Sequence, residues 1–570
     1  MSGDAPGAYD RVMNEADVLA AHRGPRLRQP GMTPEWVRSQ LIGSDVHMTT
    51  PFGAPRITYA DHVASGRSLQ WIEDFIAGRV LPMYANTHTE DSATGACMTA
   101  LAHDASRLIK ASLGAPGCKL LFCGTGCTAA IRRLQEILGL VVPESLRRQV
   151  IDTLPASRRA LVFVGPYEHH SNEVSWRETI AEVVELPLNA EGGIDLDALV
   201  DALRDAVPTG RPLIGSFSAA SNVTGALTDT RAVARLLHEH GALACFDFAA
   251  GAPHLEIDMR VGEPEGYDAV FISAHKLVGG PGAPGILAFD PALYRLRAPS
   301  RPGGGTVSYV CAHAHSYVDD IEQREDAGTP GTVQRIRAAL AFIVKDSVGA
   351  RTITRLEGWM IRSAISRLSR HPNIEVLGNL AAPRLAILSF LVRCRDGRQL
   401  HPRLVTRLLN DLFGIQARAG CACAGPYAHL LLGIGPPLAD AYRDAVLRGY
   451  LVVKPGWTRI NFSYFIDAAE FKFLQDAIEF VAVHGERFIN EYRCDWRTGA
   501  WQHPRDQMQP GLLALAGEPL AMSQRRAHLQ SFEDCMRNAH AVLSALPRAC
   551  QPVENTLPRD LPESLVAFSH

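Results

Sequence analysis

One lysine of this chain stands at an unusual place. Lys276 follows an apolar run in VFISAHKLVGG (270–280) and precedes Gly/Pro-rich sequence, which predicts the end of a buried strand. The chain has only six lysines, so a lysine there needs its own reason. An amine condenses with an aldehyde only when unprotonated, and burial lowers a lysine pKa from about 10.4 toward neutrality. The position indicates Schiff-base chemistry, with a surface lysine in a turn as the alternative.

A carboxylate and two imidazoles follow two further apolar runs. Asp247 ends ALACFD (242–247), where a carboxylate is costly to bury unless a cation such as a protonated pyridine nitrogen lies beside it. His169 and His170 follow ALVFV (160–164), and open α/β sheets bind ligands at the carboxyl ends of their strands. A pair of loop histidines without a ligand is the alternative.

A glycine-containing turn precedes an amphipathic helix in KLLFCGTGCTAAIRRLQEILG (119–139). Free N–H groups and the positive end of the helix dipole bind phosphate at such a place, and the hydroxyls of Thr125 and Thr128 add donors around Gly126 and Cys127. Turns of this kind also occur without a phosphate. The position of this one, before the two histidines, favours a cofactor-phosphate site.

Three motifs together carry a resemblance to a known family: E-H-H-S-N (168–172), S-A-H-K (273–276) and A-G-T-P (327–330). They resemble the class V, fold-type I pyridoxal-phosphate enzymes, most closely the cysteine desulfurase and selenocysteine lyase branch, over about residues 55–485. The resemblance implies pyridoxal 5'-phosphate held as a Schiff base on Lys276, with His169 stacked on its ring. It also implies that Asp247 pairs with the pyridine nitrogen.

The resemblance implies further contacts for residues in matching positions. Ser273 and His275 would add phosphate donors, and Asn222 of S-N-V-T-G would lie near the cofactor's phenolic oxygen and the substrate carboxylate. Thr329 would reach the phosphate of a neighbouring subunit, and the expectation of a homodimer rests on that match. Ser65 and His88 match the family's opening turn and N-x-H segment and are expected on the substrate side, where a capping or solvated His88 is the alternative.

Two motifs near the end of the resemblance concern the substrate. Arg459 in TRINFSYF matches the arginine that clamps a substrate α-carboxylate through two parallel hydrogen bonds. ARAGCACAGPY (417–427) places Arg418 at the family's arginine and Cys423 at its reactive cysteine. The expected catalytic residues are thus Lys276, His169 and Cys423. A pair of inert thiols is the alternative for Cys421 and Cys423, and no cysteine or histidine of zinc spacing accompanies them, so no metal is expected.

Two positions depart from the family pattern. Ala250 stands where desulfurases carry a glutamine that bonds the phenolic oxygen, and Ala129 replaces the usual acid of the phosphate turn. The first departure leaves the reaction less defined than the cofactor.

Composition limits the partners. The net charge of the 570 residues is −3, which gives no electrostatic footprint for nucleic acid or an anionic membrane. The polar N-terminus and the absence of an apolar run of about 18 residues predict a cytoplasmic protein without a membrane segment. Twelve scattered cysteines fit a reducing compartment. The expected partners are a small amino-acid substrate, a second copy of the chain and a protein that accepts sulfur.

The expected fold is α/β. By the resemblance, a fold-type I large domain contains a mostly parallel seven-stranded sheet with helices on both faces, followed by a smaller α+β C-terminal domain. An amphipathic helix at 348–370 and strand-like runs after it support the second part. The expected boundaries are an N-terminal extension at 1–50, the large domain at 51–345, the small domain at 346–490 and a C-terminal extension at 491–570.

The expected function resembles cysteine desulfuration, in which Cys423 takes sulfur from the substrate as a persulfide and alanine is released. Another class V reaction, such as transamination, epimerisation or a decarboxylative biosynthetic step, is the first alternative. A non-catalytic scaffold is the second. The presence of Lys276, Asp247, His169 and Arg459 together argues against a scaffold, which has no use for that set.

Overall fold

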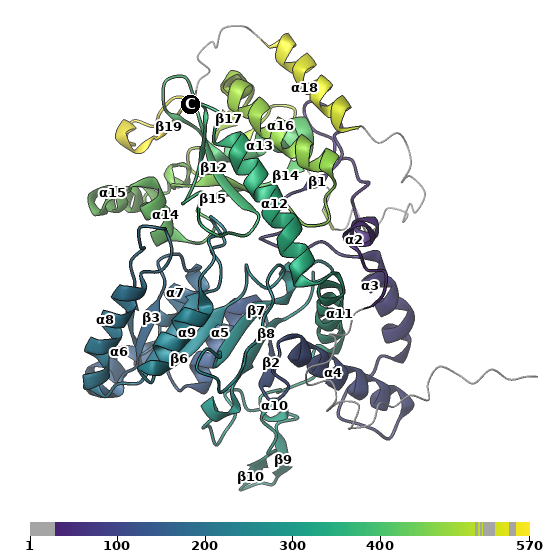
Figure 1. Cartoon of the computed structure of the whole chain (residues 1–570), viewed down its shortest axis with the longest axis vertical. Coiled ribbons are helices and arrows are strands. Elements are labelled where there is room, and N and C mark those ends of the chain that lie inside the picture. The colour runs from purple at the N-terminus through teal and green to yellow at the C-terminus, as the bar shows by residue number, and fades with distance from the viewer. Residues whose placement is uncertain (1–28, 508–510, 513–515, 517–530, 547–554, 570) are drawn as a thin grey trace, which may run out of the picture.

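A seven-stranded sheet forms the larger part of the computed structural model, which describes residues 29–507, 511–512, 516, 531–546 and 555–569 (Figure 1). The strand order is β2-β8-β7-β6-β5-β3-β4, and β8 alone runs antiparallel to its neighbours. These strands are β2 (Lys119–Cys123), β3 (Leu161–Val164), β4 (Glu182–Glu185), β5 (Leu213–Ser218), β6 (Leu243–Asp247), β7 (Ala269–Ser273) and β8 (Gly285–Phe289). The expected mostly parallel sheet is confirmed.

Helices cover both faces of this sheet because its strands are apolar on both sides. Alternate residues, such as Phe163 and Val164, belong to two separate hydrophobic cores. One core contains residues of α5 (Gly126–Ile137) and α7 (His170–Arg177). The other contains residues of α4 (Ala93–Ser112), α8 (Leu196–Ala206), α9 (Thr230–Glu239) and α11 (Thr332–Val348). The side chains that follow the strand ends are thereby held between two packed layers.

A second, smaller sheet lies above the first in Figure 1, and helix α12 (Ala350–Leu368) runs between the two parts. Its order is β15-β16-β12-β13-β19, with β11 also paired to β12. The strands are β11 (Ile374–Val376), β12 (Ile387–Arg393), β13 (Gln399–Leu400), β15 (Arg418–Gly420), β16 (Trp457–Asn461) and β19 (Phe568–Ser569). With helices α13 (Pro402–Phe413) and α16 (Ala468–His484) it makes the expected smaller α+β part.

Several described elements after residue 490 are built into this second part. Helix α18 (Phe532–Ala545) contributes Cys535, Ala539 and Leu543 to the small hydrophobic core, and β19 extends the small sheet in parallel with β13. The short strands β17 (Arg493–Cys494) and β18 (Trp501–Gln502) form a hairpin in the same region. The domain boundaries stay a prediction.

Two described residues before the large sheet, Phe52 and Ala60, also belong to the small core. Helix α2 (Pro34–Gln40) begins as its sequence predicts, since Thr33 Oγ1 accepts a hydrogen bond from Trp36 N at 3.2 Å. Strand β1 (Thr58–Tyr59) pairs in parallel with β14 (Ile415–Gln416) of the small part. The turn that follows β1 therefore lies between the two sheets.

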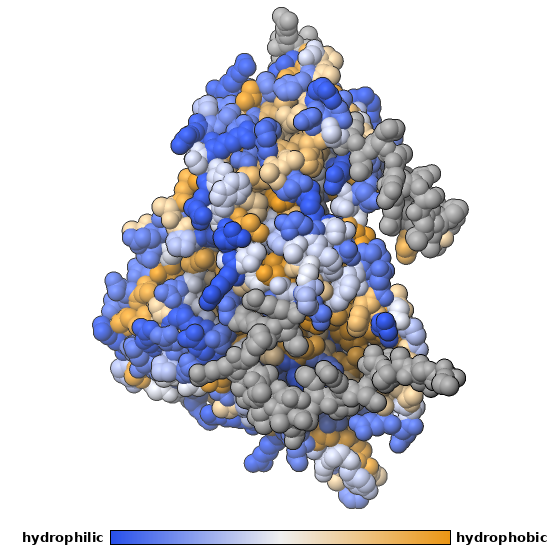
Figure 2. Space-filling view, turned by 45° about the vertical axis from the view of Figure 1, so that its right-hand side comes forward, coloured by the Kyte–Doolittle hydropathy of each residue, from blue (hydrophilic) through white to orange (hydrophobic). Residues whose placement is uncertain are grey.

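The remaining elements are short or peripheral. Hairpin β9–β10 projects at the bottom of Figure 1. The short or peripheral elements include α3 (Gln70–Phe75), the turns Ile76–Val80 and Leu81–Met83, α6 (Glu144–Thr153), β9 (Val307–Val310), β10 (His315–Tyr317), α10 (Ile321–Arg324), α14 (Gly425–Leu432) and α15 (Pro436–Leu447). In Figure 2, hydrophilic residues spread over the visible face with hydrophobic ones among them. Within the described residues, no helix combines the length and apolar character needed to cross a membrane.

Candidate active site

A cavity of about 220 Å³ opens where the two sheets meet, at the carboxyl ends of β5, β6 and β7. Thirteen of the predicted site residues line it, and the first and last of them are more than 330 residues apart in the sequence. These residues are Thr125, Gly126, Cys127, Thr128, His169, Asn222, Asp247, Ser273, His275, Lys276, Arg418, Cys423 and Arg459.

The turn before helix α5 is pressed against the lysine segment. Cys127 N donates a hydrogen bond to Ser273 Oγ at 2.9 Å. Gly126 has a φ of +58°, and a Cβ there would lie 2.7 Å from Ser273 Oγ and 2.8 Å from His275 Cε1. Only glycine fits this close approach. The turn thus presents helix-terminal N–H groups together with the hydroxyls of Thr125 and Thr128, a donor set that suits a phosphate.

Lys276 ends the short helical turn Ala274–Lys276 that follows β7. Burial lowers its pKa, while the nearby Cys127 and Asp247 act in the opposite direction and Arg459 adds to the lowering. A lysine whose pKa is lowered carries more of the neutral amine that Schiff-base chemistry requires.

Asp247 ends β6 and is 3% exposed. Its Oδ1 accepts a hydrogen bond from Ala249 N at 2.7 Å, and burial raises its pKa although that bond, the Cys127 thiol and Lys276 lower it. A cation beside this carboxylate would offset the cost of burying it. The protonated ring nitrogen of pyridoxal phosphate is such a cation, so this residue fits that group.

His169 caps helix α7. Its Nδ1 accepts a hydrogen bond from Ser171 N at 3.1 Å, and burial together with the charge of Lys276 lowers its pKa to about 4. The ring is therefore neutral at physiological pH and fixed in orientation. Sequence reasoning did not single out Ser171, whose hydroxyl lies 2.6 Å from Thr128 Oγ1 across the phosphate turn.

Two arginines meet at one carboxylate. Arg459 Nη2 and Arg418 Nε contact the two oxygens of Asp61 at 2.8 and 3.1 Å. Arg459 Nη1 also donates to Asn222 O at 2.8 Å. Arg459 is 3% exposed, and its buried Nε has no hydrogen-bond partner among the described residues. A buried donor without a partner costs free energy, and a bound carboxylate would satisfy it.

Cys423 is exposed at the mouth of the cavity, on a turn in the left-handed conformation with φ of +51° at Ala422 and +59° at Cys423. Three hydrogen bonds tie this turn to the large sheet. Asn222 Nδ2 donates to Ala422 O at 2.7 Å, His170 N donates to Cys423 O at 2.8 Å, and Gly425 N donates to His170 Nε2 at 2.9 Å. Cys421 does not line the cavity.

Three predicted site residues lie outside this cavity. Ser65 is adjacent, with its Oγ 3.4 Å from His275 O. His88, at a φ of +64°, lines a different cavity of about 500 Å³ beside α4 and α10. Thr329 is exposed on the turn that follows Asp326.

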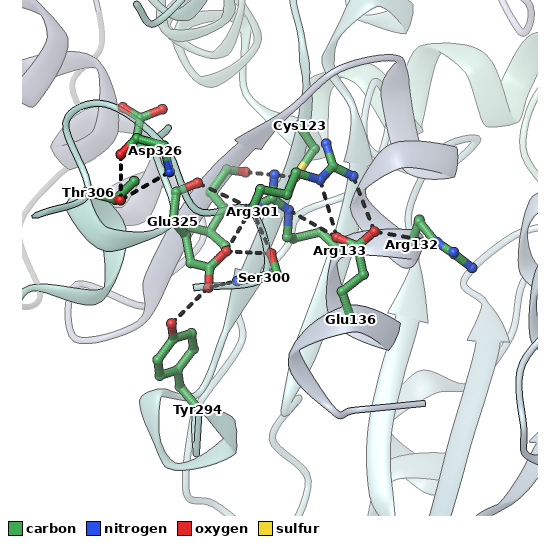
Figure 3. A network of polar contacts seen from close by, with 12 residues as sticks. Cys123, Arg132, Arg133, Glu136, Tyr294, Ser300, Arg301, Thr306, Glu325 and Asp326 are labelled. Atoms are coloured by element: carbon green, nitrogen blue, oxygen red, sulfur yellow. Dashed lines mark hydrogen bonds and ion pairs between the residues drawn. The ribbon is translucent and has the colours of Figure 1, made fainter. Parts of the chain in front are cut away.

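A buried network anchors the turn that carries Thr329. Glu325 accepts hydrogen bonds from Tyr294 Oη at 2.8 Å, from Ser300 N at 2.9 Å and from Ser300 Oγ at 2.6 Å, and it pairs with Arg133 at 2.7 Å (Figure 3). These donors hold the pKa of Glu325 low despite its burial. Because Arg133 belongs to α5, the Thr329 turn and the phosphate turn are attached to one helix.

Several lining residues were missed by sequence reasoning. Most of them are small side chains, whereas Ala250, which the sequence already marked as a departure from the family pattern, also lines the cavity. Ser218 could have been found, because it ends an apolar run one strand away from Asp247 and is its register partner. Asp61, which contacts both arginines without lining the cavity, was missed as well. The other missed residues are Val63, Ala64, Ala220, Ala249 and Ala422. Among the described residues, no group of three or more His, Cys, Asp or Glu could hold a metal ion.

Comparisons with known proteins place the chain in a family. A family model described as Aminotransferase class-V matches residues 58–435. A probable cysteine desulfurase of Streptomyces coelicolor is 25% identical over 431 residues, which covers 75% of this chain and 92% of that protein. A cysteine desulfurase of Klebsiella pneumoniae is 30% identical over 269 residues, 46% of this chain and 62% of that protein.

Solved structures share the fold. The apo structure of a cysteine desulfurase from Thermococcus onnurineus superposes with a TM-score of 0.63 at 19% identity and covers 79% of this chain and 98% of that one. A cysteine desulfurase of Escherichia coli, solved in an S-sulfonic acid form, gives a TM-score of 0.59 at 21% identity over 79% of this chain and 98% of that one.

Proposed function

Because the chain belongs to the aminotransferase class-V family, we propose that it is a pyridoxal 5'-phosphate enzyme that cleaves the carbon–sulfur bond of L-cysteine or a similar small amino acid. The products are alanine and a persulfide on Cys423. The observation that carries the proposal is that an exposed thiol, a partly buried lysine of lowered pKa and the buried Arg459 line one cavity. The names of the relatives point to the same reaction.

The cofactor would be held by groups that fit its parts. Thr125, Thr128 and N–H groups of this turn other than that of Cys127 would bind the phosphate, with Ser273 and His275 beside them. Asp247 would keep the ring nitrogen protonated, and the neutral His169 would lie against the ring. When bound, pyridoxal phosphate supplies an electron-accepting ring conjugated to the substrate's Cα.

Protein groups perform the remaining tasks. Arg459 binds the substrate carboxylate through its unpartnered Nε, and Asp61 holds its guanidinium in place. The amine of Lys276 removes the Cα proton and returns protons to the product carbon. The Cys423 thiolate attacks the substrate sulfur, so a sulfur–sulfur bond forms and the carbon–sulfur bond breaks. The carbon keeps that electron pair, takes up a proton and leaves as alanine.

Assembly and sulfur delivery extend the proposal. We propose a homodimer in which Thr329 of one subunit reaches the cofactor phosphate of the other, supported by the exposure of the A-G-T-P turn and its anchoring by Glu325. The exposed position of Cys423 would let a partner protein accept the persulfide sulfur.

A different class V reaction is the second candidate, and Ala250 favours it. An alanine cannot bond the phenolic oxygen as the relatives' glutamine does, so the cofactor's electronic properties here differ from theirs. Transamination, epimerisation or a decarboxylative step would use Lys276 and Arg459 without a thiol.

Two cysteine variants decide between the candidates. Cys423→Ser should keep the cofactor absorbance and still bind cysteine, but its release of sulfide and alanine should fall by at least about 10²-fold, since the nucleophile is removed. Cys421→Ser is the matched control and should stay within about threefold of the parent, because Cys421 does not line the cavity. Equal turnover by Cys423→Ser and the parent enzyme would contradict the persulfide mechanism and favour the second candidate.

A further inference from the structure

A buried carboxyl lies beneath the cavity wall and has no part in the proposed reaction. Glu168 is 3% exposed and accepts four hydrogen bonds. Its Oε1 accepts from Gly165 N at 3.2 Å and Ser218 N at 2.9 Å. Its Oε2 accepts from Asn172 Nδ2 at 2.7 Å and Ser218 Oγ at 2.6 Å.

Ser218 connects this carboxyl to the cavity. It ends β5, lines the cavity and is the register partner of Asp247 on the neighbouring strand, so the two side chains lie on the same face of the sheet. Its 2.6 Å bond to Glu168 has the length of a hydroxyl donating to a carboxylate. While Glu168 is ionised, the hydroxyl hydrogen of Ser218 is committed to it, and Ser218 presents only lone pairs toward the cavity.

Protonation of Glu168 reverses one of its four hydrogen bonds. Backbone N–H groups and an amide NH₂ can only donate, so Gly165, Asn172 and the Ser218 N–H keep their direction. A hydroxyl can donate or accept. A proton on Oε2 would therefore be donated to Ser218 Oγ, and the serine hydrogen would become free to point toward the cavity.

We propose that Glu168 and Ser218 form a proton-dependent relay in the cavity wall, in which Ser218 donates either to Glu168 or, once Glu168 is protonated, toward the cavity beside Asp247. Glu168 is then a positioning residue that acts through Ser218. A hydroxyl donating beside Asp247 stabilises its carboxylate, whereas lone pairs there do not. The relay rests on the proposed function only for the identity of the cofactor that Asp247 contacts.

The electrostatic surroundings make the relay responsive near neutral pH. Burial raises the pKa of Glu168 to about 7, against the lowering effect of Ser218 and Asn172, and the charge of Asp247 from β6 adds to the rise. Tyr167 from the same turn is also titratable, and its hydroxyl bonds Thr228 Oγ1 at 2.7 Å. Helix α7 and strand β5 contribute the uncharged Asn172 and Ser218. A cation paired with Asp247 would lower the pKa of Glu168, and by linkage the proton on Glu168 would affect what binds beside Asp247.

The first experiment measures the proton directly in the cofactor-free protein. Infrared difference spectra across neutral pH should show a protonated-carboxyl band with a midpoint near pH 7. The band should disappear in Glu168→Gln, and its midpoint should rise by about one pH unit in Ser218→Ala, which loses a donor to the ionised form. Ser216→Ala is the matched control on the same strand: its Oγ bonds Asn172 Oδ1 at 2.6 Å and it does not line the cavity, so the midpoint should stay unchanged.

The second experiment follows the absorbance of the cofactor-loaded protein with pH. The parent and Ser216→Ala should share a transition that Ser218→Ala lacks. The relay is wrong if no carboxyl band titrates across neutral pH, or if Ser218→Ala keeps both the band midpoint and the absorbance transition. Glu168→Gln places an amide NH₂ against Asn172 Nδ2, so that two donors face each other. If this variant does not fold, the Ser218→Ala comparison decides alone. Neither readout uses Cys423 or substrate turnover, so failure of the relay is distinct from failure of the proposed reaction.

Discussion

Burial shifts the pKa values of Lys276 and Asp247 in opposite directions. It lowers the pKa of the amine and raises the pKa of the carboxyl. Each residue reduces this effect on the other, and the two stand at the ends of adjacent strands. Two groups with perturbed pKa values that line one cavity indicate a functional site.

Replacing the lysine tests this interpretation. Lys276→Ala should lose catalysis by about 10²–10⁴-fold and should form no borohydride-stable adduct with pyridoxal phosphate, because the condensing amine is gone. Peptide mapping of the reduced parent protein checks the position of the adduct. Lys454→Ala, at an exposed lysine, is the control and should behave as the parent. An adduct on any other lysine of the parent contradicts the assignment.

At the scale of elements, helix α5 organises the site at two points along its length. Its N-terminal turn supplies the phosphate donors, while Arg133 within it holds Glu325 and so the turn with Thr329. Gly126 begins the helix and Gly139 follows it, both with positive φ, but only Gly126 has atoms of other segments within 4 Å. Alanine substitutions at the two glycines can therefore distinguish the effect of backbone strain from the effect of the close approach.

Gly126→Ala should therefore weaken cofactor binding by about tenfold or more, since its Cβ would displace Ser273 and His275 from the phosphate turn. The left-handed backbone conformation would add about 1–2 kcal/mol of strain. Gly139→Ala should incur the strain alone and keep the parental cofactor affinity. Fluorescence titration of the apo variants with pyridoxal phosphate measures the affinity, and thermal unfolding measures the strain. Equal affinities in the two variants would refute the role of the close approach.

At the scale of the whole molecule, the cavity combines side chains of two sheets, yet Thr329 lies away from it on the surface. A site completed by a second subunit would account for both observations. The large sheet contributes Lys276 and Asp247, the small sheet contributes Arg418 and Arg459, and Thr329 of the partner would close the phosphate side.

Subunit mixing tests the shared site. Lys276→Ala and Thr329→Ala should each lower activity, and co-refolding equal amounts should restore about a quarter of parental activity, because half of the dimers are mixed and each mixed dimer carries one intact site. Sedimentation should show a dimer for both variants. If Thr329 instead serves its own subunit, mixing restores nothing above the average of the two variants.

The strand-end residues were predictable because apolar runs that stop at a polar residue mark the carboxyl edge of a parallel sheet. Lys276, Asp247 and His169 follow that rule. The ion pair of Asp61 with Arg418 and the bonds from His170 to the Cys423 turn were not predictable. Each of these contacts joins residues more than 250 positions apart, and no local pattern encodes such a pairing. The incorporation of helix α18 into the small core was missed for the same reason.

The parallel pairing of Thr58 with Ile415 has a consequence for how the chain reaches this structure. Native contacts of such high sequence separation are slow to form, because a long loop must close before they stabilise anything. The large sheet, built between residues 119 and 289 with mostly successive strands, can form before the small core closes. Until that closure Phe52, Phe413 and Phe488 lack the core that buries them, so we expect a folding intermediate to expose apolar surface at this place.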